Sequence, residues 1–341
     1  MAPLNPRQHR VHRLVWGYTA LLALIALLIQ FTGDHWWLGT LLMFGPRWVW
    51  GVPLFPLALI AVVPLSAGKL RATLPPLLGA AVLLAVPIMG WTLHFGSNPH
   101  QDNSDIRLLT YNIGTDLVSG YSTVKLSSLR WLVEFVHADI AVFQECNVSE
   151  EDLKVAFPEY DVSSAFDACM VTRYVVSSTD LRDRADIQAL HGSGVIERFE
   201  LLTPRGPVSL LNLHLETVRK GLEQILNDPL GLPAALANNI RLRRVESSAA
   251  RRWAARASVP SIIVGDFNMP QESRIYRNYW RGYDNAFTNC GRGFGYTKVS
   301  GKSGIRIDHV LYDSRMECIS AYVLSSLGGD HRPLFATLRL R

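Results

Sequence analysis

Five short polar fragments in the last two-thirds of the chain combine residue types that metal-dependent hydrolysis requires. They are Thr110-Tyr111-Asn112, Gln144-Glu145, Asn212-Leu213-His214, Gly265-Asp266-Phe267-Asn268, and Asp308 followed by Asp330-His331. Four of the five follow or interrupt an apolar run of strand character. A carboxylate, amide or imidazole at the end of a buried strand is costly unless a ligand or metal uses it, and strand ends often converge on active sites. The fragments therefore predict a metal-dependent hydrolase.

Glu145 is the strongest metal-ligand candidate in these fragments. A carboxylate suits a hard divalent ion such as Mg²⁺ or Mn²⁺, and no Cys and His cluster has the spacing of a zinc site. Asn112 is placed to hold a metal-bound water or a phosphate oxygen. Taken alone, Glu145 would be a helix cap or surface charge, and Asn112 a turn residue before Gly114. We predict metal roles for both because they occur together with the other fragments.

Asp266 and Asn268 form a carboxylate and amide pair. In an extended segment the two project to the same side, and Phe267 points to the other. Asp266 is suited to orienting an attacking water, and the Asn268 amide to stabilising charge on a phosphoryl oxygen. The alternative for this pair is an Asx-turn at the end of a strand.

His331 stands beside Asp330, with Asp308 upstream in the chain. A histidine hydrogen-bonded to an aspartate is held in one tautomer and stays cationic more readily, which suits a group that faces phosphate. We assign His331 and Asp308 to catalysis, and we count Asp330 among the metal ligands with Asn112 and Glu145.

A second imidazole, His214, stands between apolar residues. It is suited to protonating a leaving oxygen, although a core histidine bonded to a backbone carbonyl is the alternative. His309 lies next to Asp308, but strand alternation places it on the opposite face. We therefore predict a structural role for His309.

The elements that must position these residues are short strands. Strand character recurs at 106–112, 140–144, 168–177, 194–202, 207–214, 261–265, 306–312, 318–325 and 334–340, and helical periodicity is clearest at 126–137 and 234–257. So many strands with few helices predict two sheets packed face to face with helices outside, rather than one parallel sheet. A domain of 237 residues can bury such a core.

The N-terminal third is apolar enough to enter a membrane. Leu14–Phe31, Trp48–Ala67 and Leu74–Phe95 are each predicted to cross a bilayer core of about 30 Å, which takes roughly 20 helical residues. A cleaved signal peptide is the alternative for the first stretch, but two further spans follow it and no small-residue cleavage site stands after Phe31. We predict a membrane domain at 1–96, a linker at 97–104 and a catalytic domain at 105–341.

The basic residues predict the orientation of these spans. Arg7, Arg10 and Arg13 place the N-terminus inside, and a short basic loop at 69–71 lies inside as well. Three crossings predict a multi-pass protein of the inner membrane with an extracytoplasmic catalytic domain. A further crossing by the apolar segment 36–45 would place the catalytic domain in the cytoplasm instead, but ten residues are too few to span the bilayer.

Charge and cysteine content restrict the functional classes. Residues 105–341 hold all but six of the 34 Lys and Arg and all but two of the 29 Asp and Glu, which leaves a formal charge of +1. A nearly neutral domain argues against binding nucleic acid as its main task. The four cysteines are scattered without metal-ligand spacing, so we expect buried free thiols, with a disulfide as the alternative for an exported domain.

In this order, the fragments resemble the endonuclease/exonuclease/phosphatase superfamily over roughly residues 105–341. The resemblance implies a four-layer α/β/β/α sandwich, in which two mixed sheets are flanked by helices and the all-α transmembrane segment precedes them. It also implies that Asn112 and Glu145 bind metal, that His214 is a general acid, that Asp266 and Asn268 position water and phosphate, and that Asp308 supports His331 in a closing Asp330-His331 pair.

The implied reaction is Mg²⁺- or Mn²⁺-dependent hydrolysis of a phosphoester. We expect a membrane-anchored phosphodiesterase or phosphatase whose substrate is a lipid or a small phosphoester and which contacts the bilayer. An extracytoplasmic nuclease is the first alternative, and a catalytically inactive, membrane-tethered binding module is the second. No feature indicates an obligate protein partner. Between the fragments, the apolar stretch 218–239 is expected to be a packed helical insert, with a lid on the bilayer as its alternative.

Overall fold

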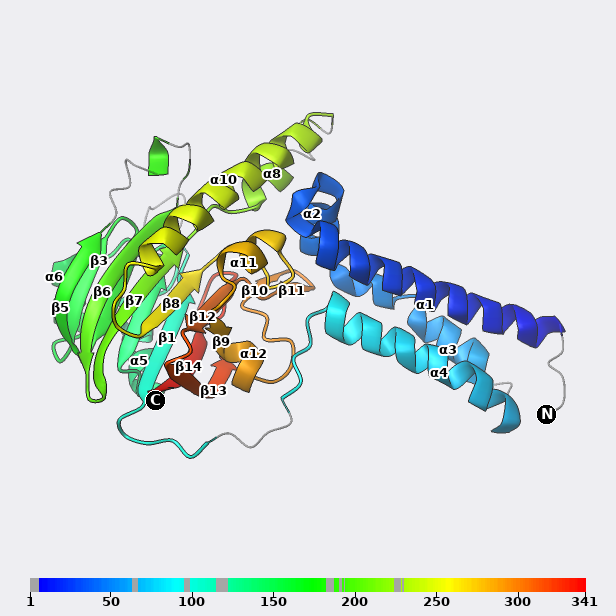
Figure 1. The fold of residues 1–341 in the computed structure, drawn as a ribbon, viewed down its shortest axis with the longest axis horizontal. Helices are drawn as coiled ribbons and strands as arrows, with labels where there is room; N and C mark the ends of the chain where they lie inside the picture. The colour runs from blue at the N-terminus through cyan, green and yellow to red at the C-terminus, as the bar shows by residue number, and fades with distance from the viewer. Residues whose placement is uncertain are drawn as a thin grey trace. The chain divides into compact units, whose positions relative to one another are not determined.

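The computed structural model describes residues 6–62, 67–94, 99–114, 122–181, 187–189, 192, 194–223, 228 and 230–341. The predicted linker at 97–104 and the predicted insert at 218–239 therefore lie partly outside the described residues. The chain divides into two units (Figure 1). One consists of residues 1–91 with 272–274, and the other of residues 92–271 with 275–341.

In the described part of the first unit, all regular secondary structure is helical. Its elements are α1 (Pro6–Thr32), η1 (Gly33–His35), α2 (Trp37–Phe44), η2 (Arg47–Gly51), α3 (Leu54–Val62), α4 (Ala67–Leu83) and η3 (Leu84–Ile88). Buried side chains of α1, among them Leu22, Ile25 and Ile29, pack with Met43 and Ala80. Leu14, Leu24, Leu27 and Phe31, also from α1, are exposed.

One helix of this unit, His9–His35, is long and apolar enough to cross a membrane, and it contains the first predicted span. The helices Trp37–Phe44 and Arg47–Ile60 are long and apolar enough for a second span only if they are counted together, and the two are bent by 79° at the break between them. The apolar helix Thr73–Ile88, which overlaps most of the third predicted span, is shorter. Among the described residues, the structure thus offers one candidate anchor where the sequence predicted three.

The second unit contains two six-stranded sheets. The first has the order β13-β14-β1-β2-β4-β3 and the second β5-β6-β7-β8-β12-β9. Each sheet is mixed, because β1 and β2 are parallel, as are β7 and β8, while the other pairs are antiparallel. The strands of the first sheet are β1 (Ile106–Asn112), β2 (Ile140–Gln144), β3 (Asp161–Ala165), β4 (Ala168–Thr172), β13 (Met316–Val323) and β14 (Leu334–Leu340). Those of the second are β5 (Val175–Leu181), β6 (Val195–Thr203), β7 (Gly206–His214), β8 (Ser261–Asp266), β9 (Asp284–Asn285) and β12 (Asp308–Tyr312).

The largest hydrophobic core lies between the two sheets. Alternate residues of the central strands point into it, for example Leu108 of β1, Val142 of β2, Leu210 of β7 and Val264 of β8. The intervening residues point outward beneath helices. Side chains of α10 (Leu232–Ala254) pack on the second sheet, and those of α5 (Leu126–Phe135) and α6 (Glu150–Ala156) on the first. Figure 1 shows α10 lying along β6, β7 and β8.

These layers form the predicted four-layer α/β/β/α sandwich, which the structure confirms. The shorter elements that the structure describes here are α8 (Arg219–Leu222), α11 (Arg274–Tyr279), α12 (Ala286–Cys290) and the hairpin of β10 (Lys298–Ser300) with β11 (Ser303–Ile305). No pattern in the sequence predicted this hairpin.

Both pairs of cysteines are joined as disulfides, so the expectation of free thiols was wrong. Cys146 bonds to Cys169 of β4, and Cys290 of α12 bonds to Cys318 of β13. The physical reason is the strand register. Phe143 pairs with Cys169 across β2 and β4, and the turn after β2 brings Cys146 back against it.

Candidate active site

The predicted site residues meet at the ends of the central strands. Asp266 ends β8, and it is paired in register with His214 at the end of β7 and with Asp308 at the start of β12. Asp266 and Asp308 each occupy the inward-facing position next to a core valine, Val264 and Val310, and His214 follows Asn212 on the inward-facing side of β7. The five polar fragments thus converge on one rim of the space between the sheets.

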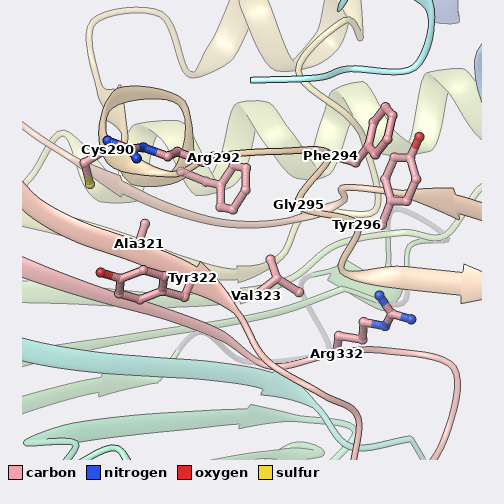
Figure 2. Close-up of a pocket in the computed structure, with 10 residues that line it drawn as sticks. Cys290, Arg292, Phe294, Gly295, Tyr296, Ala321, Tyr322, Val323 and Arg332 are labelled. Carbon is pink, nitrogen blue, oxygen red and sulfur yellow. The ribbon is translucent and has the colours of Figure 1, made fainter. Parts of the chain in front are cut away.

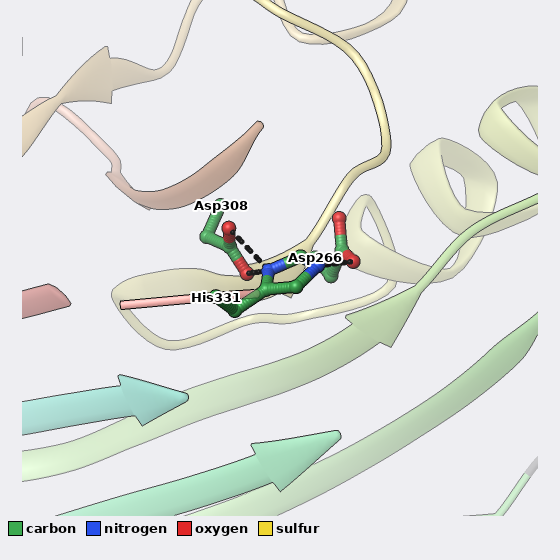
Figure 3. Close-up of side chains that lie close together, drawn as sticks. All are labelled: Asp266, Asp308 and His331. Carbon is green, nitrogen blue, oxygen red and sulfur yellow. Dashed lines mark hydrogen bonds and ion pairs between the residues drawn. The ribbon is translucent and has the colours of Figure 1, made fainter. Parts of the chain in front are cut away.

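Asp266, Asp308 and His331 form a buried cluster (Figure 3). Nδ1 of His331 lies 3.0 Å from Oδ2 of Asp308, and Nε2 lies 3.7 Å from Oδ2 of Asp266. Each of the three side chains offers one possible ligand atom, and these three atoms lie within 4.8 Å of one another. The imidazole therefore has one nitrogen on Asp308, and its other nitrogen faces Asp266.

Asn112 connects this cluster to Glu145. Its Nδ2 lies 3.0 Å from Oδ2 of Asp266 and 3.1 Å from Oε1 of Glu145, and its Oδ1 accepts from the backbone N–H of Gly114. His214 completes the group, because its Nε2 lies 3.8 Å from Glu145 and 3.9 Å from Asp266. The structure thus brings together residues that lie up to 219 positions apart, from Asn112 to His331.

Asp266 and Asn268 form an Asx-turn at the end of β8, which was the alternative given for this pair. The backbone N–H of Asn268 donates to Oδ1 of Asp266 over 2.8 Å, and its Nδ2 donates to the carbonyl of Leu215. The turn does not remove Asn268 from the site, since the amide nitrogen has a second N–H.

Backbone strain is concentrated at these residues. Glu145 and Asn268 both have φ near +51°, a left-handed conformation that costs a residue with a side chain roughly 1–2 kcal/mol. Strain of this kind persists where the surrounding structure imposes it, and it is common at functional sites. Gly265 has φ of +130°, and a Cβ there would lie 2.0 Å from the carbonyl oxygen of Leu213, so only glycine fits beside Asp266.

Asp330 lies at the edge of the cluster and is half exposed. Its Oδ2 accepts from Nζ of Lys298 over 2.8 Å, and its Oδ1 lies 3.9 Å from Nε2 of His331. A lysine partner is unusual for a carboxylate that binds metal, and the metal role of Asp330 stays a prediction. His309 lies on the opposite face of β12, as predicted, where its ring nitrogens contact Asn285 and the carbonyl of Met269.

The charges of the cluster depend on one another. Burial and the neighbouring Asp308 raise the pKa of Asp266. Burial would also raise the pKa of Asp308, but His331 and the Thr297 hydroxyl outweigh it and hold that pKa below its usual value. Burial would lower the pKa of His331, and the carboxylates of Asp308 and Asp266 raise it instead. The arrangement favours an Asp308 carboxylate paired with a cationic His331.

The donor set fits a hard divalent cation. Asp266 and Asp308 are both almost fully buried, and the Asn112 amide links Asp266 to Glu145 by hydrogen bonds. The three carboxylates all offer oxygen ligands. Carboxylates crowded in this way repel each other and gain from a bound cation. Because all cysteines are in disulfides, no thiolate competes for a softer metal.

Beneath the cluster lies a buried polar chain that the sequence analysis missed. Gln144 contacts Thr110 and donates to Oδ1 of Asn212 over 2.8 Å, and Asn212 donates to Oε2 of Glu197 over 3.0 Å. Burial raises the pKa of Glu197 to about 7, although the bond from Asn212 lowers it. Gln144 and Asn212 already stood in the polar fragments, but Glu197 lies mid-strand, where only its unusual burial identifies it.

A pocket of about 560 Å³ lies in the same unit (Figure 2). Aromatic and basic side chains line it, including Phe287, Arg292, Phe294, Tyr296, Tyr322 and Arg332. The rings of Phe294 and Tyr296 stack with centroids 5.0 Å apart, above Arg332 in the view of Figure 2. One lining residue, Arg332, directly follows His331 in the chain, but Asp266, Asp308 and His331 do not line the pocket.

Comparison with known proteins agrees with this fold. The structure superposes on endonuclease/exonuclease/phosphatase family proteins from Bacteroides thetaiotaomicron (TM-score 0.52, 16% identity, 70% of this chain and 98% of that one) and Bacteroides vulgatus (0.52, 16%, 70% and 99%). It also superposes on humanized TDP2 of D. rerio (0.52, 14%, 70% and 100%). No curated protein matches the chain in sequence.

Similarity at these identities shows the fold alone, whereas a match to a family model shows the family. The model described as the Endonuclease/Exonuclease/phosphatase family matches residues 109–331, well over half of the chain, and that range contains every residue of the buried cluster. The chain belongs to the endonuclease/exonuclease/phosphatase family and is one of its phosphoester hydrolases.

Proposed function

We propose that the protein is a membrane-anchored, divalent-metal-dependent phosphodiesterase or phosphatase that acts on a lipid or small phosphoester outside the cytoplasm. The observation that carries this proposal is the buried cluster of Asp266, Asp308 and His331, joined to Glu145 through Asn112. A buried set of carboxylates with an oriented imidazole suits attack by water on phosphorus.

Asn112 and Glu145 would hold a Mg²⁺ or Mn²⁺ ion, with Asp330 as a further predicted ligand. Such a metal supplies charge neutralisation at the phosphoryl oxygens. Asp266 would orient the attacking water and take its proton, because burial and Asp308 raise its pKa and make it a stronger base than an exposed aspartate.

His331 and Asn268 would stabilise the negative charge that develops on the phosphoryl group. Asp308 fixes the imidazole so that Nε2 is directed into the cluster, and the second N–H of Asn268 remains for a phosphoryl oxygen. His214 lies within 4 Å of both Glu145 and Asp266, a position from which it would protonate the leaving oxygen.

Two observations support a membrane-anchored enzyme outside the cytoplasm. The helix His9–His35 is long and apolar enough to be an anchor. The two disulfides are of a kind that persists in oxidising compartments and is rare in the cytosol. We propose an inner-membrane location with the second unit on the outer side.

A nuclease is the second candidate. One solved structure with this fold is D. rerio TDP2 complexed with a single-strand DNA product. The near-neutral charge of residues 105–341 argues against it, because binding to a nucleic acid draws on neutralisation of several phosphates. A binding module without activity is disfavoured because each predicted catalytic residue type is present and the strand ends bring them together.

The test is a hydrolysis screen of the full chain in detergent micelles, with Mg²⁺ and with EDTA. Phospholipids, inositol phosphates, p-nitrophenyl phosphate, its bis ester and DNA serve as substrates. We expect Mg²⁺-dependent release of product from at least one lipid or small phosphoester, and less from DNA. A fully EDTA-resistant activity, or activity on DNA alone, would overturn the proposal. Reporter fusions at the C-terminus would determine the side of the membrane.

A further inference from the structure

Lys298 is a charged residue at the cluster that neither the fragments nor the family resemblance identified. It begins β10, and its backbone forms an isolated bridge with His331. Two more backbone bonds, from Val299 N–H to the Asp330 carbonyl and from Arg332 N–H to the Thr297 carbonyl, join the same segments. The hairpin is thereby fixed against the segment that carries the catalytic imidazole.

The Lys298 side chain reaches the outward nitrogen of that imidazole. Its Nζ lies 2.9 Å from Nε2 of His331 and 2.8 Å from Oδ2 of Asp330. Nε2 is the nitrogen that Asp308 leaves free to face the cluster. The Lys298 side chain is 26% exposed and its partner Asp330 is half exposed, whereas His331 is almost fully buried, so the lysine lies at the solvent-facing edge of the cluster.

An ammonium has three N–H donors, and one of them bonds to Asp330, which holds the lysine in place. Nε2 of a cationic His331 carries its own hydrogen and cannot accept from Nζ, so in the described part of the chain two ammonium donors remain for a ligand. A phosphoryl oxygen placed beside Nε2 of His331 would lie within reach of Nζ as well. Charge-assisted hydrogen bonds of this type are about twice as strong as neutral ones.

We propose that Lys298 binds a phosphoryl oxygen together with His331 and thereby selects terminal phosphate monoesters over diesters. This inference rests on the proposed phosphoester hydrolysis and narrows its substrate class. A monoester carries a charge of about −1.5 to −2 and three free oxygens. A diester carries one charge and two free oxygens, so it gains less from an added cation. The buried carboxylates of Asp266 and Asp308 repel a dianion more strongly than a monoanion, so a monoester depends more than a diester on the Lys298 ammonium to offset that repulsion.

The test compares Lys298→Met with the wild-type full chain in detergent micelles, with Mg²⁺ present. The substrates are p-nitrophenyl phosphate and its bis ester, and inorganic phosphate serves as a competitive inhibitor. We expect kcat/KM on the monoester to fall about 100-fold, as for loss of one oxyanion donor, and on the diester only about tenfold. The inhibition constant of phosphate should rise in Lys298→Met. Lys298→Arg keeps the positive charge and should recover much of the affinity for phosphate.

Lys302 supplies a matched control, because it is an exposed lysine in the turn of the same hairpin. Lys302→Met should change neither ester hydrolysis nor phosphate inhibition. Equal losses on both esters, or an unchanged inhibition constant for phosphate in Lys298→Met, would overturn the role of Lys298. A wild-type protein that is inert on both esters and on every lipid substrate would instead overturn the proposed function.

Discussion

Nδ1 of His331 lies 3.0 Å from Oδ2 of Asp308, although 23 residues separate them in the chain. Both side chains are almost fully buried, so neither can turn to water for its hydrogen bonds. The pairing leaves Nε2 directed toward Asp266 and Lys298. This contact therefore determines which nitrogen of His331 is presented to a substrate.

Replacing Asp308 with Asn should lower kcat/KM by about 100- to 1,000-fold, the range for loss of one group that stabilises charge in the transition state. Asp308 raises the pKa of His331. A step that needs cationic His331 is lost as the pH rises through that pKa, so the alkaline limb of the pH–rate profile should move to lower pH in the variant. Asp284→Asn, an exposed change on the neighbouring strand β9, is the control. An unshifted alkaline limb in Asp308→Asn would contradict this assignment.

Replacing Glu145 with Gln should weaken metal binding. Glutamine has nearly the size and shape of glutamate, so it adds no strain to the left-handed backbone at φ +51°. It removes the negative charge that a hard cation prefers. We expect Mn²⁺ affinity, measured by titration calorimetry, to fall at least tenfold, because loss of even a residue that only orients a metal ligand costs about 10- to 100-fold. Glu151→Gln on α6 is exposed and should bind Mn²⁺ as the wild type does. Equal affinities in the two variants would remove Glu145 from the metal site.

Each disulfide should stabilise the second unit by about 3.5 kcal/mol, given the chain-entropy estimate for separations of 23 and 28 residues. Cys146 also directly follows Glu145, whereas the pair of Cys290 and Cys318 lies on α12 and β13. Denaturant unfolding should therefore show similar losses for the two double alanine variants. Mn²⁺ affinity should fall only in Cys146→Ala/Cys169→Ala. A comparable loss of affinity in Cys290→Ala/Cys318→Ala would show that the effect is not local.

Glu197 should make stability fall as the pH rises. Its pKa is about 7 in the folded protein and 4.5 as a model value, so the native state holds the proton that the unfolded chain releases between these values. Glu197→Gln removes this penalty and still accepts the bond from Asn212. The variant should be more stable than the wild type by on the order of 3 kcal/mol at pH 8, and by less than about 1 kcal/mol at pH 5. Parallel stability curves, from guanidinium unfolding at several pH values, would contradict this.

Much of the fold could be predicted from local pattern. The strands at 106–112, 140–144 and 334–340 have the predicted bounds, because each is a mostly buried run of strand length. The hairpin of β10 and β11 was missed since its strands have three residues each and contain Ser and Gly rather than an apolar alternation. Lys298 was missed with it.

The sequence by itself determined the residue types of the site and the layers that carry them, because a polar residue after a buried strand is visible in the chain order. Only the tertiary structure decided which of these residues touch. Strand register placed Cys146 beside Cys169, buried Glu197 under the cluster and brought Lys298 to His331. These contacts join segments far apart in the chain, and their geometry comes from how two sheets pack, which no local pattern encodes.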